Sequence, residues 1–309
     1  MFSILKKPQL TWNNHFQHSV KKRGNEQSFA VEVGALTRAP QIGFHEAVEA
    51  AHLIDQNHAG GKISLCLSGG IDSECLLRSF LQARVDFEVY IMRFANDLNL
   101  FDIKTNIALC SSLGVNHKFV DLNVIKFFEE QQHMKYAQKY RCQSPQIATH
   151  LWLLDQLDGV PVLSGNPFAR SVLGDNSFFI GLPGDLHCTY FRYFENTRRD
   201  GVPWFFIYTP ELCAAFLRTP TTQQFGLSGL GPESFSYLHK CRSYQEAGFK
   251  ALPRENKFTG FELVRAHYDR LSNTTHGTEF DRLFREPMVR MNPYPDSYTQ
   301  RVPLSYFKI

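Results

Sequence analysis

The fold is decided by the stretch Ile63-Ser64-Leu65-Cys66-Leu67-Ser68-Gly69-Gly70-Ile71-Asp72-Ser73, in which an apolar run leads into a turn with two glycines. Residues 63–67 have the composition of a strand that is buried on both faces of a parallel sheet. After the turn, apolar residues between Ser73 and Ala83 recur at helical spacing. The stretch therefore predicts a buried strand, a tight turn and a helix in immediate succession.

Strands and helices continue to alternate after this stretch. We expect further strands at 87–94, 116–121 and 159–163, and helices at 99–113, 124–139 and 144–157. Ser144-Pro145 is typical of a helix N-cap and the first helical residue, and Gly114 is typical of a helix end. The alternation predicts an α/β fold with a doubly wound parallel sheet, whose ligands bind at the carboxyl ends of the strands.

The regions on either side of this α/β segment have a different pattern. Residues 1–42 are polar and irregular apart from a strand-like run at 29–33, and a helical pattern follows at 44–56. Beyond residue 190 we expect a strand at 204–208, a helix at 210–217, and otherwise helical or irregular structure. We therefore predict an N-terminal extension with a leading helix (1–60), an α/β domain (61–190) and a C-terminal region on the substrate side (191–309).

The composition excludes several classes of protein. With 43% hydrophobic and 20% charged residues, the chain has the make-up of a globular protein. No run of about 20 apolar residues is present, so we expect no membrane-spanning helix. The first residues lack the apolar core of a signal peptide, and a cytoplasmic location is expected. The net charge of +3 does not indicate a nucleic-acid partner, but leaves one open.

The seven cysteines are scattered, and no two are spaced as CxxC. This argues against a disulfide framework and against a four-cysteine zinc or iron–sulfur site. The chain therefore offers no metal site that is built from cysteines.

The turn at 68–73 has the features of a phosphate site. Backbone N–H groups at the start of a helix, together with the helix dipole, attract anions, and small residues let phosphate oxygens approach. Ser68 and Ser73 add hydroxyl donors, and we expect Gly69 and Gly70 to allow positive φ and close approach. Asp72 would repel phosphates unless it contacts Mg²⁺ or caps the turn by bonding to backbone amides, and the sequence leaves both roles open.

Ser-Gly-Gly-x-Asp-Ser between a buried strand and a helix resembles the signature of the PP-loop ATP pyrophosphatases, and the match at 68–73 is complete. The resemblance implies a Rossmann-like fold of the PP-loop type that binds ATP and Mg²⁺. In this family a substrate oxygen attacks the α-phosphate, pyrophosphate is released and an adenylated intermediate remains. A tight turn without a ligand is the alternative interpretation.

The resemblance also implies further site residues. The end of the second strand would lie against the adenine, with backbone groups contacting the base, although Ile91 and Phe94 could equally be core residues. Two basic residues of the C-terminal region would fold back over the triphosphate, or could belong to a surface loop. The loop after residue 163 would lie near the phosphates. Its Asn-Pro-Phe-Ala-Arg has no acidic residue, unlike the acidic versions of this loop in the family, and this argues against a metal-binding role for the loop. The candidates at the end of the second strand are Met92, Arg93 and Phe94. The two basic residues are Arg254 and Lys257, and those of the loop after residue 163 are Ser164, Gly165, Asn166 and Arg170.

Within the family, the asparagine synthetase-type domain is the nearest resemblance. Position 2 is Phe and not the Cys of many glutaminase domains, so we expect an external amine or ammonia donor and a carboxylate- or amide-type substrate. Relatives often pair, which implies a homodimer. One alternative is a sulfur-transfer enzyme or an enzyme similar to the sulfate-nucleotide reductases, for which Cys142 is the best thiol candidate. Another alternative is a nucleotide-binding module without turnover.

Overall fold

The computed structural model describes residues 16–23, 26–165, 170–173, 177–180, 184–227, 237–252, 259–292, 297–301 and 303–307. Its strands are β1 (Phe16–Arg23), β2 (Glu26–Val33), β3 (Ile63–Leu67), β4 (Glu88–Phe94), β5 (His117–Leu122), β6 (Val160–Leu163), β7 (Arg170–Leu173), β8 (Ser177–Ile180) and β9 (Ser297–Arg301). Its α-helices are α1 (Gly43–Asn57), α2 (Ile71–Ala83), α3 (Leu100–Ser112), α4 (Val124–Glu129), α5 (His133–Tyr140), α6 (Pro145–Gln156), α7 (Gly184–Thr197), α8 (Pro210–Leu217), α9 (Pro220–Leu227), α10 (Tyr237–Glu246), α11 (Phe261–Leu271), α12 (Thr278–Phe280) and α13 (Glu286–Met291). Shorter helical segments are η1 (Ala95–Asp97), η2 (Phe205–Ile207), η4 (Asp281–Arg285) and η5 (Leu304–Tyr306).

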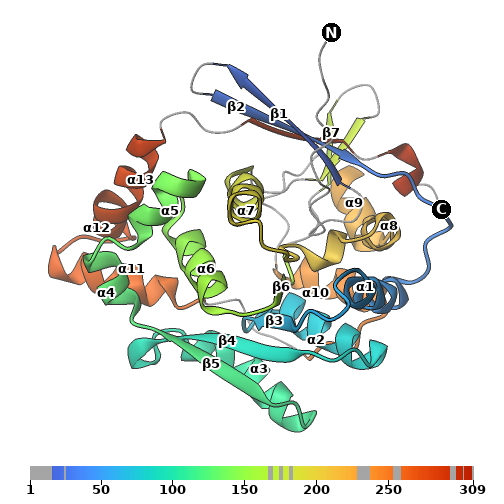
Figure 1. Ribbon diagram of the computed structural model, residues 1–309, viewed down its shortest axis with the longest axis horizontal. Coiled ribbons are helices and arrows are strands. Elements are labelled where there is room, and N and C mark those ends of the chain that lie inside the picture. The colour runs from blue at the N-terminus through green and yellow to red at the C-terminus, as the bar shows by residue number, and fades with distance from the viewer. Residues whose placement is uncertain are drawn as a thin grey trace.

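The predicted α/β fold is confirmed, with a four-stranded parallel sheet in the order β5-β4-β3-β6. From β3 the chain moves outward through β4 to β5 and then returns to the other side of β3 to form β6. Because such crossovers are right-handed, α2 and α3 cover one face of the sheet and α6 covers the other (Figure 1). The order of the strands reverses between β3 and β6, and ligands of such sheets bind at this switch point.

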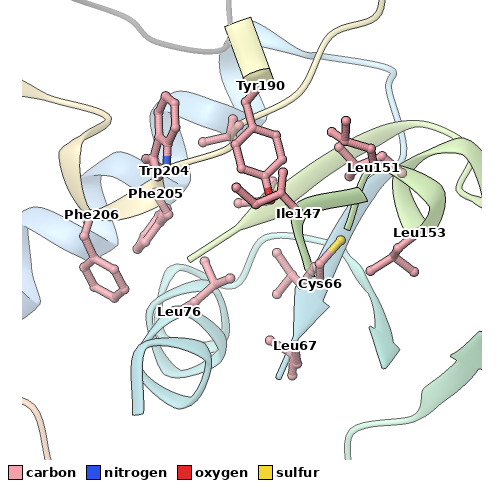
Figure 2. Packing of buried hydrophobic residues seen from close by; sticks show 14 of the residues in the cluster. Cys66, Leu67, Leu76, Ile147, Leu151, Leu153, Tyr190, Trp204, Phe205 and Phe206 are labelled. Atoms are coloured by element: carbon pink, nitrogen blue, oxygen red, sulfur yellow. The ribbon is translucent and has the colours of Figure 1, made fainter. Parts of the chain in front are cut away.

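The buried character of β3 explains why it stands at the centre of the sheet. All five of its residues are buried, with side chains that alternate between the two layers of helices. Cys66 points toward Ile147 and Tyr190, whereas Leu67 points to the opposite face, on which α2 carries Leu76 (Figure 2). The strand therefore anchors the turn that follows it to the core of the molecule.

Most helix boundaries match the predicted ones. Ser144 caps α6 by accepting a hydrogen bond from the Ile147 N–H, and Gly114 follows α3 with φ +65°. The helix expected at 124–139 is instead two helices, α4 and α5. The break lies at Gln131, whose φ of +57° is incompatible with a continuing right-handed helix.

The C-terminal region differs from the expectation in two respects. The strand expected at 204–208 is a short 3-10 helix, η2. The irregular structure expected near the C-terminus includes β9, which pairs in parallel with β2, while β2 pairs antiparallel with β1 (Figure 1). Pairing partners this far apart in sequence cannot be deduced from local patterns. The division at residues 60 and 190 stays a prediction.

Among the described residues, no helix is long and apolar enough to cross a membrane.

Candidate phosphate site

The turn from β3 to α2 is organised by its two serines. The Ser68 N–H donates to Ser73 Oγ over 3.0 Å, and the two hydroxyl oxygens lie 3.1 Å apart. The Gly70 N–H donates to Ser68 Oγ over 3.3 Å. The hydroxyl groups of Ser68 and Ser73 therefore hold the turn in shape as well as bordering the start of α2.

The N-terminus of α2 is suited to an anion. Gly70 is the N-cap residue and no side chain caps the helix, so the first-turn amides of residues 71–73 have neither a helical nor a capping partner. These N–H groups and the helix dipole attract a negative charge to the end of the helix. They lie at the carboxyl end of β3, beside the switch point of the sheet.

The conformation of the glycines differs from the expectation. Gly70 has φ −71° and Gly69 is not among the positive-φ glycines, so neither uses the left-handed region. Gly69 is needed for close approach instead. A Cβ at this position would lie 1.5 Å from the backbone oxygen of Asp102 on α3. The glycine thus lets α3 pack directly against the turn.

Three polar residues of α3 and its N-cap fasten this helix to the turn and to β4. Asp102 Oδ2 accepts from the Gly69 N–H over 3.3 Å, and Asn106 Nδ2 donates to the Ser68 carbonyl. Asn99 bonds to the end of β4. Their spacing of three and four residues places them on one side of α3. We call Asn99, Asp102 and Asn106 the polar ridge.

Asp72 is bonded to two side chains of α10. Lys240 Nζ lies 2.5 Å from Oδ2, and the Tyr244 hydroxyl donates to Oδ1 over 2.5 Å. All three side chains are largely buried, with 10% of Asp72 and 17% of Lys240 exposed. Burial and the neighbouring carboxylate raise the pKa of Tyr244 well above its usual value, which keeps the phenol protonated as a donor. Asp72 therefore fastens α10 over the start of α2.

This arrangement bears on the two roles considered for Asp72. The carboxylate bonds to side chains of α10 and not to amides of the turn, so the hydrogen bonds do not support capping. Across the described ranges, no cluster of three or more His, Cys, Asp or Glu residues could hold a metal. Mg²⁺ commonly takes one or two protein carboxylates together with phosphate oxygens. Both Asp72 oxygens already accept from Lys240 and Tyr244, so a Mg²⁺ role of Asp72 stays a proposal in which the ion arrives with the phosphates.

Glu74, in the first turn of α2, fixes the segment that follows α10. Its side chain is fully buried, pairs with Arg78 over 2.8 Å and accepts from the Leu252 N–H over 3.0 and 3.2 Å. Two acidic residues of one helix turn, Asp72 and Glu74, thus hold two different parts of the C-terminal region.

The end of β4 lies on the other side of the turn. Arg93 forms a bidentate pair with Asp121 on β5, over 2.6 and 3.0 Å, and its guanidinium lies 4.3 Å from the centre of the Phe119 ring. This pair raises the pKa of Arg93. Ile91 and Phe94 are buried core residues, as their alternative interpretation predicted, and Met92 is half-buried. The side chain of Arg93 is thus engaged with β5.

The predicted residues after β6 are described only in part. Ser164 and Gly165 lie at its carboxyl end, across the switch point from the turn. Gly165 has φ +74°, and a Cβ there would lie 2.5 Å from Trp204 Cδ1. Arg170 begins β7, where its backbone pairs opposite Ile180. Asn166, Arg254 and Lys257 lie outside the described residues.

Cys142 is fully buried, and its Sγ donates to the Ser144 carbonyl over 3.2 Å. A thiol in this setting has the burial of a small apolar core residue and not of a reactive nucleophile. Lys139, three residues before Cys142, lines a hollow of about 670 Å³ between α5 and α6. Arg141 follows α5 with φ +53°.

Sequence reasoning missed Lys240, Tyr244 and the polar ridge. Lys240 and Tyr244 are spaced i and i+4 on α10, which was a usable signal that both lie on one helix face. Their approach to Asp72 depends on tertiary packing across 168 positions for Lys240 and 172 for Tyr244, which no local pattern encodes. The helical spacing of the polar ridge was a signal of the same kind.

Among solved structures, the chain is similar to the NMN synthetase from Francisella tularensis, at 13% identity and a TM-score of 0.35 over 82% of this chain and 96% of that chain. It is also similar to the NH3-dependent NAD synthetase from Campylobacter jejuni, at 13% identity and a TM-score of 0.31 over 70% of this chain and 97% of that chain. No protein-family model matches the chain, and no curated protein matches it either. Similarity at this level does not decide which ligand the chain binds or which reaction it catalyses.

Proposed function

We propose that this chain is an ATP-dependent adenylating enzyme, similar in its chemistry to the asparagine synthetase-type domain. The observation that carries the proposal is the Ser-Gly-Gly turn after β3. It leads into a helix whose first amides are uncapped and beside which Lys240 is held at Asp72. Uncapped amides, a helix dipole and an ammonium group together favour a polyphosphate.

The phosphates would bind at the amides of residues 71–73 and at the hydroxyls of Ser68 and Ser73. Lys240 would share its ammonium between Asp72 and a phosphate oxygen, because a protonated amine has three donors. The nucleoside would extend toward the end of β4, where Met92, Arg93 and Phe94 are its proposed neighbours. Ser164, Gly165, Asn166 and Arg170 are proposed for the opposite side of the switch point.

In the proposed reaction, a carboxylate or amide oxygen of the substrate forms a bond to the α-phosphorus of ATP. The bond between the α-phosphorus and the bridging oxygen breaks, and pyrophosphate leaves with its electron pair. An amine or ammonia from an external donor then attacks the adenylated carbon and displaces AMP. Mg²⁺ bound by the phosphates and Asp72 would neutralise phosphate charge.

The role of the chain's own residues is to place and neutralise charge. Pyrophosphate gains negative charge as it departs, and a fixed ammonium group close to it stabilises that charge. Lys240 is suited to this role, since α10 holds its ammonium over the first turn of α2. Arg254 and Lys257 remain proposals for additional cations.

The products of ATP turnover test the proposal. The protein would be incubated with ATP, Mg²⁺, ammonium chloride and pooled carboxylic acids, including the common amino acids, and the nucleotide products would be separated by anion exchange. We expect AMP and pyrophosphate with at least one pool, and loss of this activity in Lys240→Ala. Lys250→Ala, which removes an exposed lysine, serves as the matched control. Formation of ADP and phosphate would overturn the proposal.

The alternatives give different results in the same experiment. Binding of ATP without AMP formation from any pool would indicate a nucleotide-binding module. A requirement for a thiol would indicate sulfur chemistry, but the burial of Cys142 weighs against that residue as the thiol.

A further inference from the structure

The side chain of Asn99 occupies the backbone edge at the end of β4. The Phe94 N–H donates to Asn99 Oδ1 over 2.8 Å, and Asn99 Nδ2 donates to the Met92 carbonyl over 2.9 Å. The carboxamide thus satisfies one backbone donor and one backbone acceptor at the same time.

These two backbone groups lie on the part of β4 that its neighbour leaves open. The pairing of β3 with β4 ends at Ile91, whereas the pairing of β5 with β4 continues to Phe94. N–H and C=O groups of residues two apart point to the same side of a strand. Asn99 therefore fills the edge of β4 just beyond the point where β3 ends and the Ser68–Gly70 turn begins.

Asn99 is held firmly in this place. It is 4% exposed and lies at the N-terminus of α3, which Asp102 and Asn106 tie to the turn. A Cβ on Gly260 would lie 2.6 Å from the Cβ of Asn99, so the start of α11 covers the residue. Moving the carboxamide away would separate buried donors and acceptors from their partners, which is unfavourable.

A base that is recognised by its hydrogen-bonding edge needs a donor and an acceptor side by side. Adenine accepts at a ring nitrogen and donates from its amino group, which is the pattern that the Asn99 carboxamide presents to β4. While Asn99 holds the Phe94 N–H and the Met92 carbonyl, a base cannot pair with this donor and acceptor.

We propose that Asn99 makes this site indifferent to the base, so that nucleotides are selected by their polyphosphate. This inference rests on the proposed phosphate site at the start of α2. It predicts that the site binds a wider range of nucleotides than a site in which the β4 backbone forms hydrogen bonds with adenine.

Calorimetric titration of the full chain with ATP, GTP, CTP and inorganic tripolyphosphate, each with Mg²⁺, tests the inference without any mutation. We expect dissociation constants for the three nucleotides within about tenfold of one another, because packing alone discriminates weakly between ligands of similar shape. A preference for ATP over GTP of about 100-fold or more would overturn the inference and leave the phosphate site intact. Absence of binding by all four ligands, tripolyphosphate included, would overturn the phosphate site and the inference with it.

Two substitutions at one position sharpen the test. Asn99→Ala exposes the Phe94 N–H and the Met92 carbonyl, and we expect ATP to gain at least threefold in affinity relative to tripolyphosphate. Asn99→Asp can still accept from the Phe94 N–H but has no donor for the Met92 carbonyl. Its charge weakens all the ligands, and the ratio of ATP to tripolyphosphate affinity should rise less than in Asn99→Ala. If Asn99→Ala loses ATP but retains tripolyphosphate, Asn99 itself contacts the base and the inference is wrong. Circular dichroism confirms that each variant is folded.

Discussion

Lys240 Nζ lies 2.5 Å from Asp72 Oδ2, and this ion pair joins α10 to the first turn of α2. The Tyr244 hydroxyl bonds to the other carboxylate oxygen from one helical turn further along α10. The pair therefore has two consequences, one for the stability of this contact and one for the charge presented to a bound phosphate.

Replacing Lys240 by Ala should weaken both the contact between α10 and α2 and the binding of phosphate. Asp72 would keep the Tyr244 hydrogen bond and lose its largely buried cation, and we expect a loss of about 1–3 kcal/mol in the free energy of unfolding by urea. Affinity for Mg²⁺-tripolyphosphate should fall at least tenfold in calorimetry. Lys250→Ala should leave both quantities at their parental values. Unchanged polyphosphate affinity in Lys240→Ala would show that Lys240 is a structural residue alone.

Substitution of Gly69 by Ala should destabilise the protein. The added methyl group would lie 1.5 Å from the Asp102 backbone oxygen, so α3 would have to move away from the turn, and overpacking of this kind costs about 1–3 kcal/mol or more. Gly114→Ala is the matched control, because that glycine has φ +65° but no neighbour within 4 Å of an added Cβ. We expect Gly114→Ala to cost about 1 kcal/mol, through the backbone alone. Equal losses in the two variants would contradict the packing argument.

Much of this arrangement follows from the sequence, and some of it does not. The apolar run at 63–67 and the glycine turn sufficed to place β3, α2 and the switch point, because strand burial and turn chemistry are local. The partners of Asp72 were not predictable, because α10 reaches it only through tertiary packing. The reason for Gly69 was also missed: its backbone is ordinary, and the constraint comes from α3.

His133 should make stability depend on pH. It is 1% exposed, neither ring nitrogen has a hydrogen-bond partner, and the rings of Phe128 and Phe284 lie 5.2 and 5.4 Å away. Burial lowers the pKa of His133 to about 4. The unfolded chain, in which the imidazole has a pKa of about 6.5, binds the proton more readily. Stability is therefore full above about pH 6.5 and falls toward pH 4 by about 1.4 kcal/mol per pH unit.

Urea denaturation between pH 4 and 8 measures this slope. We expect His133→Phe to flatten the dependence, because a phenyl ring has no site for the proton. His45→Phe, at an exposed position, is the matched control for the change of side chain. An unchanged slope in His133→Phe would assign the pH dependence to other groups.

Thiol reactivity should be confined largely to one cysteine. Six of the seven cysteines are buried and Cys241, on α10, is half-buried. Burial raises the pKa of Cys66 to about 12, which disfavours its thiolate. A chromogenic disulfide reagent should therefore modify about one thiol per folded chain, and Cys241→Ser should remove that reaction. Rapid labelling of Cys142 in the folded protein would revive it as a candidate for sulfur chemistry.

The pairing of β9 with β2 also determines when this sheet can be completed during synthesis. During synthesis β2 is produced before its parallel partner at 297–301, by a time on the order of tens of seconds. Until then the open side of β2 presents unpaired N–H and C=O groups, to which other chains can add a strand. The edge of β2 therefore stays without its parallel partner until residues 297–301 have been made.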